Sequence, residues 1–188
     1  MLKRLVSIFA PLLFALSFAP AWADEYSDTI GIFKSAVESG NFFKTAYGYA
    51  VFPTIGKGGI VVGGAYGEGR VFEKGKAVGD TSMTQLSVGL QLGGQAYSEI
   101  VFFEDQRALK EFTSGNFEFG ADASVVAITA AANASASTAG NSAGASGGKK
   151  DATAVGRYFK GMATFTVAKG GLMYEAAIAG QKFSYKAH

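Results

Sequence analysis

Hydrophobic and polar residues alternate most regularly between residues 84 and 95. The even positions from Leu86 to Leu92 hold leucine or valine, and most odd positions, such as Gln85, hold glutamine, serine or glycine. Because successive side chains of a strand point to opposite faces, this pattern predicts a strand with a buried leucine face and a solvated glutamine face. A second strand is predicted over residues 97–103, with its far end buried.

Three segments have the features of helices. Residues 26–38 and 104–114 repeat apolar side chains every three or four positions, which predicts helices with one buried side. A short helix is predicted at residues 42–46. The apolar stripes are Ile30, Phe33 and Val37 in the first helix and Ala108, Leu109 and Phe112 in the last.

A glycine-rich stretch runs from Tyr47 to Val71, with valine, isoleucine and aromatic residues between the glycines. This mixture predicts strands whose glycines permit bulges, bends or close backbone approach. A turn is predicted at Pro53–Gly56, before a strand over Gly58–Tyr66. Further turns are predicted at Glu73–Lys76, where Gly75 can adopt a positive φ, and at Gly79–Asp80.

The later part of the chain also has the character of a sheet. Residues 117–130 and 157–185 contain short alternating apolar runs, and residues 131–150, mostly alanine, serine and glycine, predict a mobile loop. The predicted fold is α+β: a glycine-rich, curved antiparallel sheet or partial barrel of about seven to nine strands with two or three helices.

The first 23 residues resemble a signal peptide. A basic start precedes an apolar run, and the Ala21-Trp22-Ala23 triplet provides the small residues of a cleavage site. An uncleaved anchor is the alternative, but the apolar run is short for a membrane-spanning helix. We therefore expect cleavage after Ala23, a single domain over residues 24–188, and a periplasmic protein that associates peripherally with the membrane.

Charge gives no general argument for nucleic-acid binding. Removing the predicted signal peptide leaves 15 basic and 15 acidic residues, a net charge of zero, whereas nucleic-acid binding needs a basic surface. Residues 24–148 carry a net charge of −5 and residues 149–188 a net charge of +5. The two parts either neutralise each other in the fold or leave a basic C-terminal face for anionic lipid.

The sequence offers little for catalysis. There is no cysteine, and the single histidine is His188, so Ser-His-Asp and Cys-His arrangements and metal sites of the Cys/His type are excluded. The glycines lead into further strand rather than into a helix, which argues against a phosphate-binding loop. We predict no catalytic residue, no metal and no cofactor; a distant carboxylate pair is the enzymatic alternative.

Binding is a better prospect around the glycine-rich stretch. Glycine amides beside basic side chains can hold an anionic head group, and tyrosine suits a membrane interface. The alternative is that these are ordinary surface cations and core tyrosines. The predicted lipid-binding residues are Lys57, Gly58, Gly59, Tyr66, Arg70, Lys74 and Lys76.

The order of motifs along residues 30–186 resembles the SYLF lipid-binding family. The resemblance rests on Tyr49–Pro53, the glycine-rich segment 58–69, Gly93–Phe103 and Phe117–Ala127. It implies a non-enzymatic module that binds phospholipid head groups; some eukaryotic relatives also bind actin. This chain lacks the lipid-modified cysteine of many bacterial relatives and has an acidic segment after the predicted signal peptide. Lys57 is the best ligand candidate within the matched motif.

These observations predict a non-enzymatic envelope protein that binds anionic phospholipid through the glycine-rich sheet and its basic residues. The alternative is a periplasmic protein without a lipid ligand that is either structural or binds a protein partner of the envelope.

Overall fold

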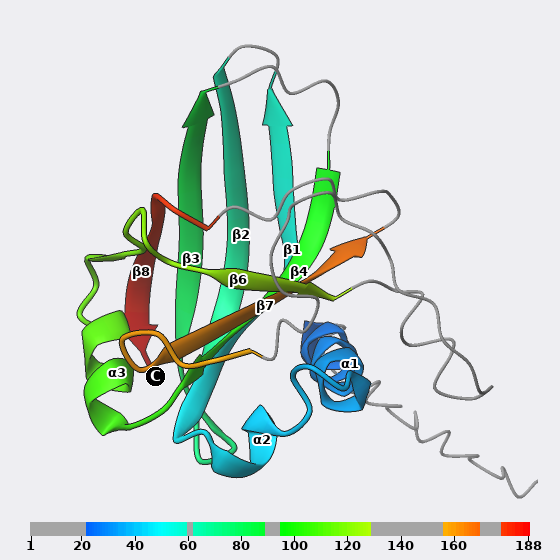
Figure 1. Cartoon of the computed structure of the whole chain (residues 1–188), viewed down its shortest axis with the longest axis vertical. Coiled ribbons are helices and arrows are strands. Elements are labelled where there is room, and N and C mark those ends of the chain that lie inside the picture. The colour runs from blue at the N-terminus through cyan, green and yellow to red at the C-terminus, as the bar shows by residue number, and fades with distance from the viewer. Residues whose placement is uncertain (1–21, 60–61, 89–94, 129–155, 170–177) are drawn as a thin grey trace, which may run out of the picture.

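The computed structural model describes residues 22–59, 62–88, 95–128, 156–169 and 178–188, and shows a half-barrel of eight strands with three helices (Figure 1). The predicted α+β class with a curved sheet is confirmed. Most of the predicted signal peptide and the whole predicted loop 131–150 lie outside the described residues. The helices are α1 (Trp22–Ser35), α2 (Phe42–Thr45) and α3 (Gln106–Phe112).

The eight strands form one sheet in the order β5-β8-β3-β2-β1-β4-β7-β6. All neighbours are antiparallel except β6 and β7, which are parallel. Residues 129–161 connect β6 to β7 along the chain. This connection is long enough for the crossover of a dozen or more residues that two parallel neighbours need. The strands are β1 (Gly48–Gly59), β2 (Val62–Glu73), β3 (Lys76–Val88), β4 (Gln95–Phe103), β5 (Phe117–Glu118), β6 (Val125–Ile128), β7 (Met162–Lys169) and β8 (Gln181–Ala187).

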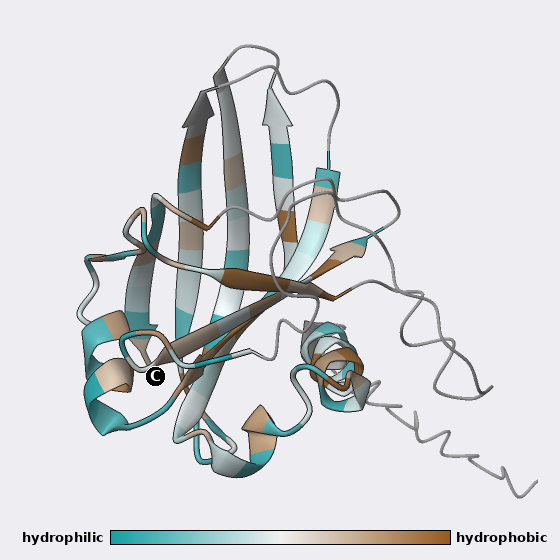
Figure 2. Ribbon diagram, viewed as in Figure 1, coloured by the Kyte–Doolittle hydropathy of each residue, from teal (hydrophilic) through white to brown (hydrophobic). Residues whose placement is uncertain are grey.

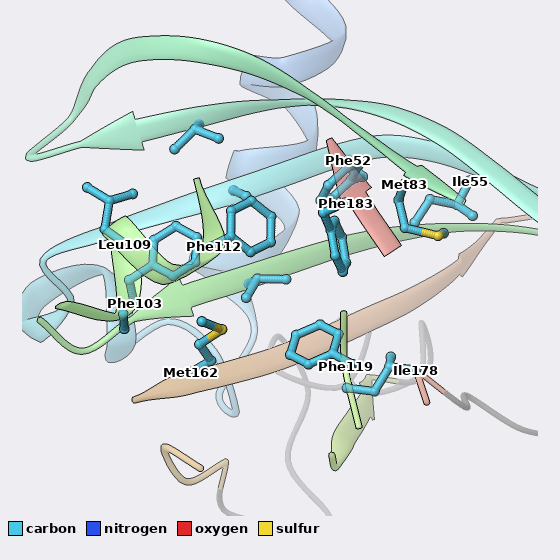
Figure 3. Packing of buried hydrophobic residues seen from close by; sticks show 14 of the residues in the cluster. Phe52, Ile55, Met83, Phe103, Leu109, Phe112, Phe119, Met162, Ile178 and Phe183 are labelled. Atoms are coloured by element: carbon cyan, nitrogen blue, oxygen red, sulfur yellow. The ribbon is translucent and has the colours of Figure 1, made fainter. Parts of the chain in front are cut away.

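Both faces of the sheet carry a hydrophobic cluster. The inner cluster gathers side chains from six strands and α3 inside the half-barrel (Figure 3). The outer cluster lies under α1 and α2, and both helices carry hydrophobic and hydrophilic segments (Figure 2), as expected for helices that pack on one side. Neighbouring residues of one strand enter opposite clusters, as Phe102 and Phe103 of β4 do.

The four long strands have two different ends. We call the part that carries Tyr49, Phe72 and Phe102 the aromatic end, because rings cover it on both faces. We call residues 54–59 of β1, 62–69 of β2 and 82–88 of β3 the glycine-rich end.

Four local predictions are confirmed. The Glu73–Lys76 segment is a hairpin turn, in which Lys74 and Gly75 both adopt positive φ. Helix α3 buries its predicted stripe, and the Asp105 side chain caps it by accepting from the Ala108 amide. The strand over Tyr97–Phe103 and the short helix α2 are also present.

Two turn predictions are wrong. Pro53–Gly56 lies within β1, where the pairing register shifts between Phe52 and Ile55, so the proline makes an irregularity rather than a turn. The predicted strand Gly58–Tyr66 is therefore divided between β1 and β2. Gly79–Asp80 lies within β3, beside another register shift. Both glycine-containing segments bend a strand instead of ending it.

The predicted side-chain directions fail at two places. Leu86 is 85% exposed and Gln85 is buried, so the leucine side of β3 faces solvent, the reverse of the prediction. The Gln85 amide is accommodated because it donates to the Ala179 carbonyl at 2.9 Å. Helix α1 ends at Ser35, which leaves Val37 beyond it and 82% exposed.

Candidate functional site

A row of residues crosses the outer face of the glycine-rich end. Gly56, Tyr66, Thr84, Lys182 and Glu118 are successive cross-strand partners from β1 through β2, β3 and β8 to β5. In Figure 1, the upper ends of β1, β2 and β3 extend beyond α1 and α2. Tyr66 is 53% exposed, and a side chain added at Gly56 would meet nothing within 4 Å. The row is therefore an open strip with little side-chain volume on the β1 side.

A cleft of about 590 Å³ lies along this strip. Leu86, one of its lining residues, offers an apolar side chain that is 85% exposed. A second cleft of about 280 Å³ shares Gly56 and Tyr66 with the first and reaches Glu25 and Tyr26 of α1. The larger cleft is lined by Gly56, Gly64, Ala65, Tyr66, Thr84, Gln85, Leu86, Glu118, Gly180 and Lys182.

The cleft carries both charge and hydrogen-bonding groups. The Lys182 ammonium lies 3.5 Å from the Glu118 carboxylate, in an exposed pair that gives at most about 1 kcal/mol. The Tyr66 hydroxyl donates to Glu68 at 3.0 Å, and this hydrogen bond is the main reason that the pKa of Tyr66 lies above its ordinary value. The strip thus presents an apolar side chain, a phenol and a weakly held ammonium together.

The predicted lipid-binding residues divide into separate groups. Tyr66 lines the cleft, and Lys57, Gly58 and Gly59 lie at the same end of the sheet. Lys57 points toward the inner side by alternation from the buried Ile55, and no ion pair of Lys57 occurs within the described residues. Lys57 is therefore a rim residue, on the opposite face from the cleft floor.

Arg70 belongs to a different contact. Its guanidinium lies 3.1 Å from Asp80 and 4.7 Å from the centre of the Tyr26 ring, which fixes it between α1 and β3. Burial raises the pKa of Asp80, but hydrogen bonds from His188 and Arg70 outweigh burial and hold this pKa below its ordinary value. His188, the last residue of the sequence, lies 2.9 Å from the Asp80 carboxylate.

Lys74 and Lys76 lie at the other end of the sheet. The Lys74 ammonium is 5.0 Å from the centre of the Tyr47 ring, at the β2–β3 hairpin. Glu73 is eight residues along β2 from Ala65, the partner of Lys57, which corresponds to about 26 Å of extended strand. These lysines and Lys57 therefore cannot hold one head group.

The C-terminal basic residues contact acidic residues of the earlier segment. Lys160 pairs with Asp122 at 2.9 Å, and Lys169 pairs with Glu25 at 3.4 Å. Together with Lys182, these contacts favour mutual neutralisation over a separate basic face.

Sequence reasoning missed two features. The first is that the Leu86 side chain points to solvent, which depends on strand pairing and cannot be read from the neighbouring residues in the sequence. The other is Glu99, a fully buried carboxyl group on β4 whose pKa burial raises to about 7. Its signal was a charged residue inside the otherwise uncharged strand Tyr97–Phe103. The described residues contain no cluster of three or more acidic, histidine or cysteine side chains suited to a metal ion.

A comparison with protein families matches residues 84–186 to Ysc84, described as a Las17-binding protein actin regulator. The match covers β4 to β8 and most of the C-terminal half of the chain. The chain belongs to the Ysc84 family. The SYLF resemblance inferred from the sequence is thereby confirmed, and the Ysc84 description is that of a binding protein rather than of an enzyme.

One curated relative is a protein of Aeromonas veronii named Beta cell expansion factor A. The two chains are 27% identical over 156 residues, which cover 82% of this chain and 51% of the relative. The chain thus spans about half the length of that relative. In the part of the chain that the structure describes, no helix is both long and apolar enough to cross a membrane.

Proposed function

We propose that this member of the Ysc84 family is an exported, non-enzymatic protein that binds anionic phospholipid at a membrane surface through the outer face of its glycine-rich end. The observation that carries the proposal is Leu86, which stands 85% exposed on a regular strand beside Tyr66. A fully solvated leucine gains about 1.5–3 kcal/mol when it is buried. At a membrane interface, Leu86 would be buried among apolar lipid groups. The phenol of Tyr66 would lie at the hydrated head-group level, where tyrosine is enriched.

Selectivity for anionic lipid comes from lysines at this end. Lys182 borders the cleft, and its exposed pair with Glu118 is weak enough to exchange for a phosphate group. Lys57 stands at the rim of the same end of the sheet. A lysine near an anionic surface contributes about 1 kcal/mol, and salt weakens this contribution.

Co-sedimentation with vesicles tests the proposal. Binding to vesicles that mix phosphatidylglycerol with phosphatidylcholine should exceed binding to phosphatidylcholine alone and should weaken as salt is added. Leu86→Ser should reduce affinity about tenfold, since about 1.4 kcal/mol corresponds to that factor. Lys57→Gln should reduce affinity about fivefold on the anionic vesicles only.

Val37→Ser is the matched control, because Val37 is 82% exposed and lies outside the glycine-rich end. It should bind as the parent protein does. Unchanged binding by Leu86→Ser, or an equal loss in Val37→Ser, would show that the glycine-rich end does not dock on the membrane.

A protein partner is the second candidate, since the family description names a protein that is bound. Mass spectrometry of material that co-purifies with the protein separates the two. Anionic phospholipid should be retained by the parent protein and lost in Leu86→Ser. A single retained protein with no lipid would favour the partner.

A further inference from the structure

Two strands on opposite walls of the half-barrel are joined through its interior. In the sheet order, β8 and β4 are separated by β3, β2 and β1. Nevertheless, the Gln181 side-chain amide at the start of β8 donates to the Glu99 carboxylate of β4 at 3.0 Å. The same nitrogen lies 3.3 Å from the Tyr97 hydroxyl. These contacts connect the two walls across the inner face.

The joined groups are buried, and several of their polar atoms are unpaired. Glu99 and Gln181 have no exposed surface, and Thr166 is almost fully buried. Within the described residues, one carboxylate oxygen of Glu99, the amide oxygen of Gln181 and the hydroxyl of Thr166 have no hydrogen-bond partner. Leaving such atoms unpaired costs about 1–3 kcal/mol each. A proton on Glu99 would remove the buried charge and give Glu99 a donor of its own.

No cation compensates the Glu99 charge among the described residues. The residues opposite Glu99 in register are Phe52 on β1 and Thr166 on β7. In the described part of the chain, the titratable neighbour is Tyr97, whose pKa is raised by burial and then by the nearby Glu99 charge, so that it stays neutral. An ionised Glu99 would therefore hold a desolvated charge with one hydrogen bond.

The contacts of residues 179–181, at the start of β8, link Gln181 to the wall of the larger cleft. Gly180 precedes Gln181 with a φ of 76°, and its amide donates to the Phe119 carbonyl. Ala179 accepts from the side chain of Gln85, and both Gly180 and Gln85 line the larger cleft. A movement of residues 179–181 therefore changes the wall of the cleft.

We propose that Glu99 and Gln181 form a proton-operated latch. Neutral Glu99 holds the start of β8 against β4 across the half-barrel, and ionised Glu99 favours a state in which the two separate and water reaches the carboxylate. The latch is independent of the lipid proposal, and its test contains no lipid.

Amide hydrogen exchange as a function of pH tests the latch. Burial holds the pKa of closed Glu99 near 7, against the ordinary value of 4.5. Opening to water should therefore become about tenfold more favourable per pH unit between these values. Corrected for base-catalysed exchange, the Gln181 and Phe183 amides should lose about 40-fold protection from pH 5 to pH 7 and about twofold more above pH 7. The Val101 amide, in the middle of β4, should lose less.

Glu99→Gln keeps the size of the side chain and removes the group that titrates. In this variant, the exchange protection of the Gln181 and Phe183 amides should therefore not depend on pH. Glu104→Gln, an exposed carboxylate directly after β4, should behave as the parent protein. Carboxyl NMR of the parent protein measures the pKa of Glu99 directly, whether or not the variant folds. A Glu99 pKa below 5, or equal pH dependence in Glu99→Gln and the parent, would overturn the latch.

Discussion

The aromatic end and the glycine-rich end belong to the same strands but differ in what covers their outer face. At the aromatic end, Phe102 packs outward against Phe43 of α2 with ring centres 4.8 Å apart. Its neighbour Phe103 packs inward against Phe112 of α3 at 4.9 Å. At the glycine-rich end, the inner residues Ile55 and Met83 are also fully buried.

The difference between the ends is therefore confined to one face. Ile55 and Met83 extend the buried inner face into the glycine-rich end. On the outer face, α1 and α2 pack over the aromatic end, whereas α1 meets the glycine-rich end at its margin, where Glu25 accepts a hydrogen bond from Thr54. An outward hydrophobic residue is core at one end, as Phe102 is, and exposed at the other, as Leu86 is. Side-chain alternation is the same in both regions, so alternation alone cannot distinguish a packing surface from a binding surface.

The largest expected effect is a difference in stability between substitutions at the aromatic end and at the glycine-rich end. Phe102→Ala should lower the free energy of unfolding by about 3–5 kcal/mol, because it leaves a cavity among packed rings. Leu86→Ala should change it by less than about 0.5 kcal/mol, since that side chain has few contacts to lose. Urea denaturation measures both. A loss above 2 kcal/mol in Leu86→Ala would mean that the outer face is covered at both ends.

The next effect concerns Glu99, which lies on the inner face between the two ends. Its pKa is raised to about 7 from 4.5, so the folded state binds this proton over a range in which the unfolded chain has lost it. The contribution of Glu99 to stability is thus fully present below pH 4.5, falls as pH rises and is lost above pH 7. The full change is about 3 kcal/mol, at about 1.4 kcal/mol per unit of pKa.

The measurement is the difference in unfolding free energy between the parent protein and Glu99→Gln, which cancels most other titrations. This difference should shift in favour of the variant from pH 5 to pH 7 and stay constant above pH 7.5. A constant difference from pH 4 to pH 8 would place Glu99 in contact with water, and the inner face would then be open near this residue.

The smallest expected effect is the difference in stability between alanine substitutions at two glycines of the ribbon formed by β1 and β2. A side chain at Gly69 would lie 2.5 Å from the Phe52 ring and 2.9 Å from the Val51 carbonyl, so Gly69→Ala should cost about 1–3 kcal/mol. Gly56→Ala should change stability by less than about 0.5 kcal/mol, because nothing lies within 4 Å. Thermal unfolding measures both, and equal costs would contradict the open outer face at Gly56.

The sequence by itself determined the features that depend on near neighbours. Helix α3 was predictable because its cap and its apolar stripe lie within eleven residues. The Glu73–Lys76 hairpin was predictable because Gly75 suits a positive φ. Abundant β-branched, aromatic and glycine residues likewise predicted a curved, strand-rich α+β fold, since these preferences act residue by residue.

Tertiary structure alone decided which face of each strand is covered and which distant residues meet. Leu86 is exposed because pairing with β2 and β8 turns Met83 and Gln85 inward. Lys57 and Lys74 are separated because β1 continues through Pro53 instead of turning there. Glu99 reaches Gln181 only because the sheet curves until β4 faces β8. Curvature and register are sums over many strand contacts, and no local window of sequence contains them.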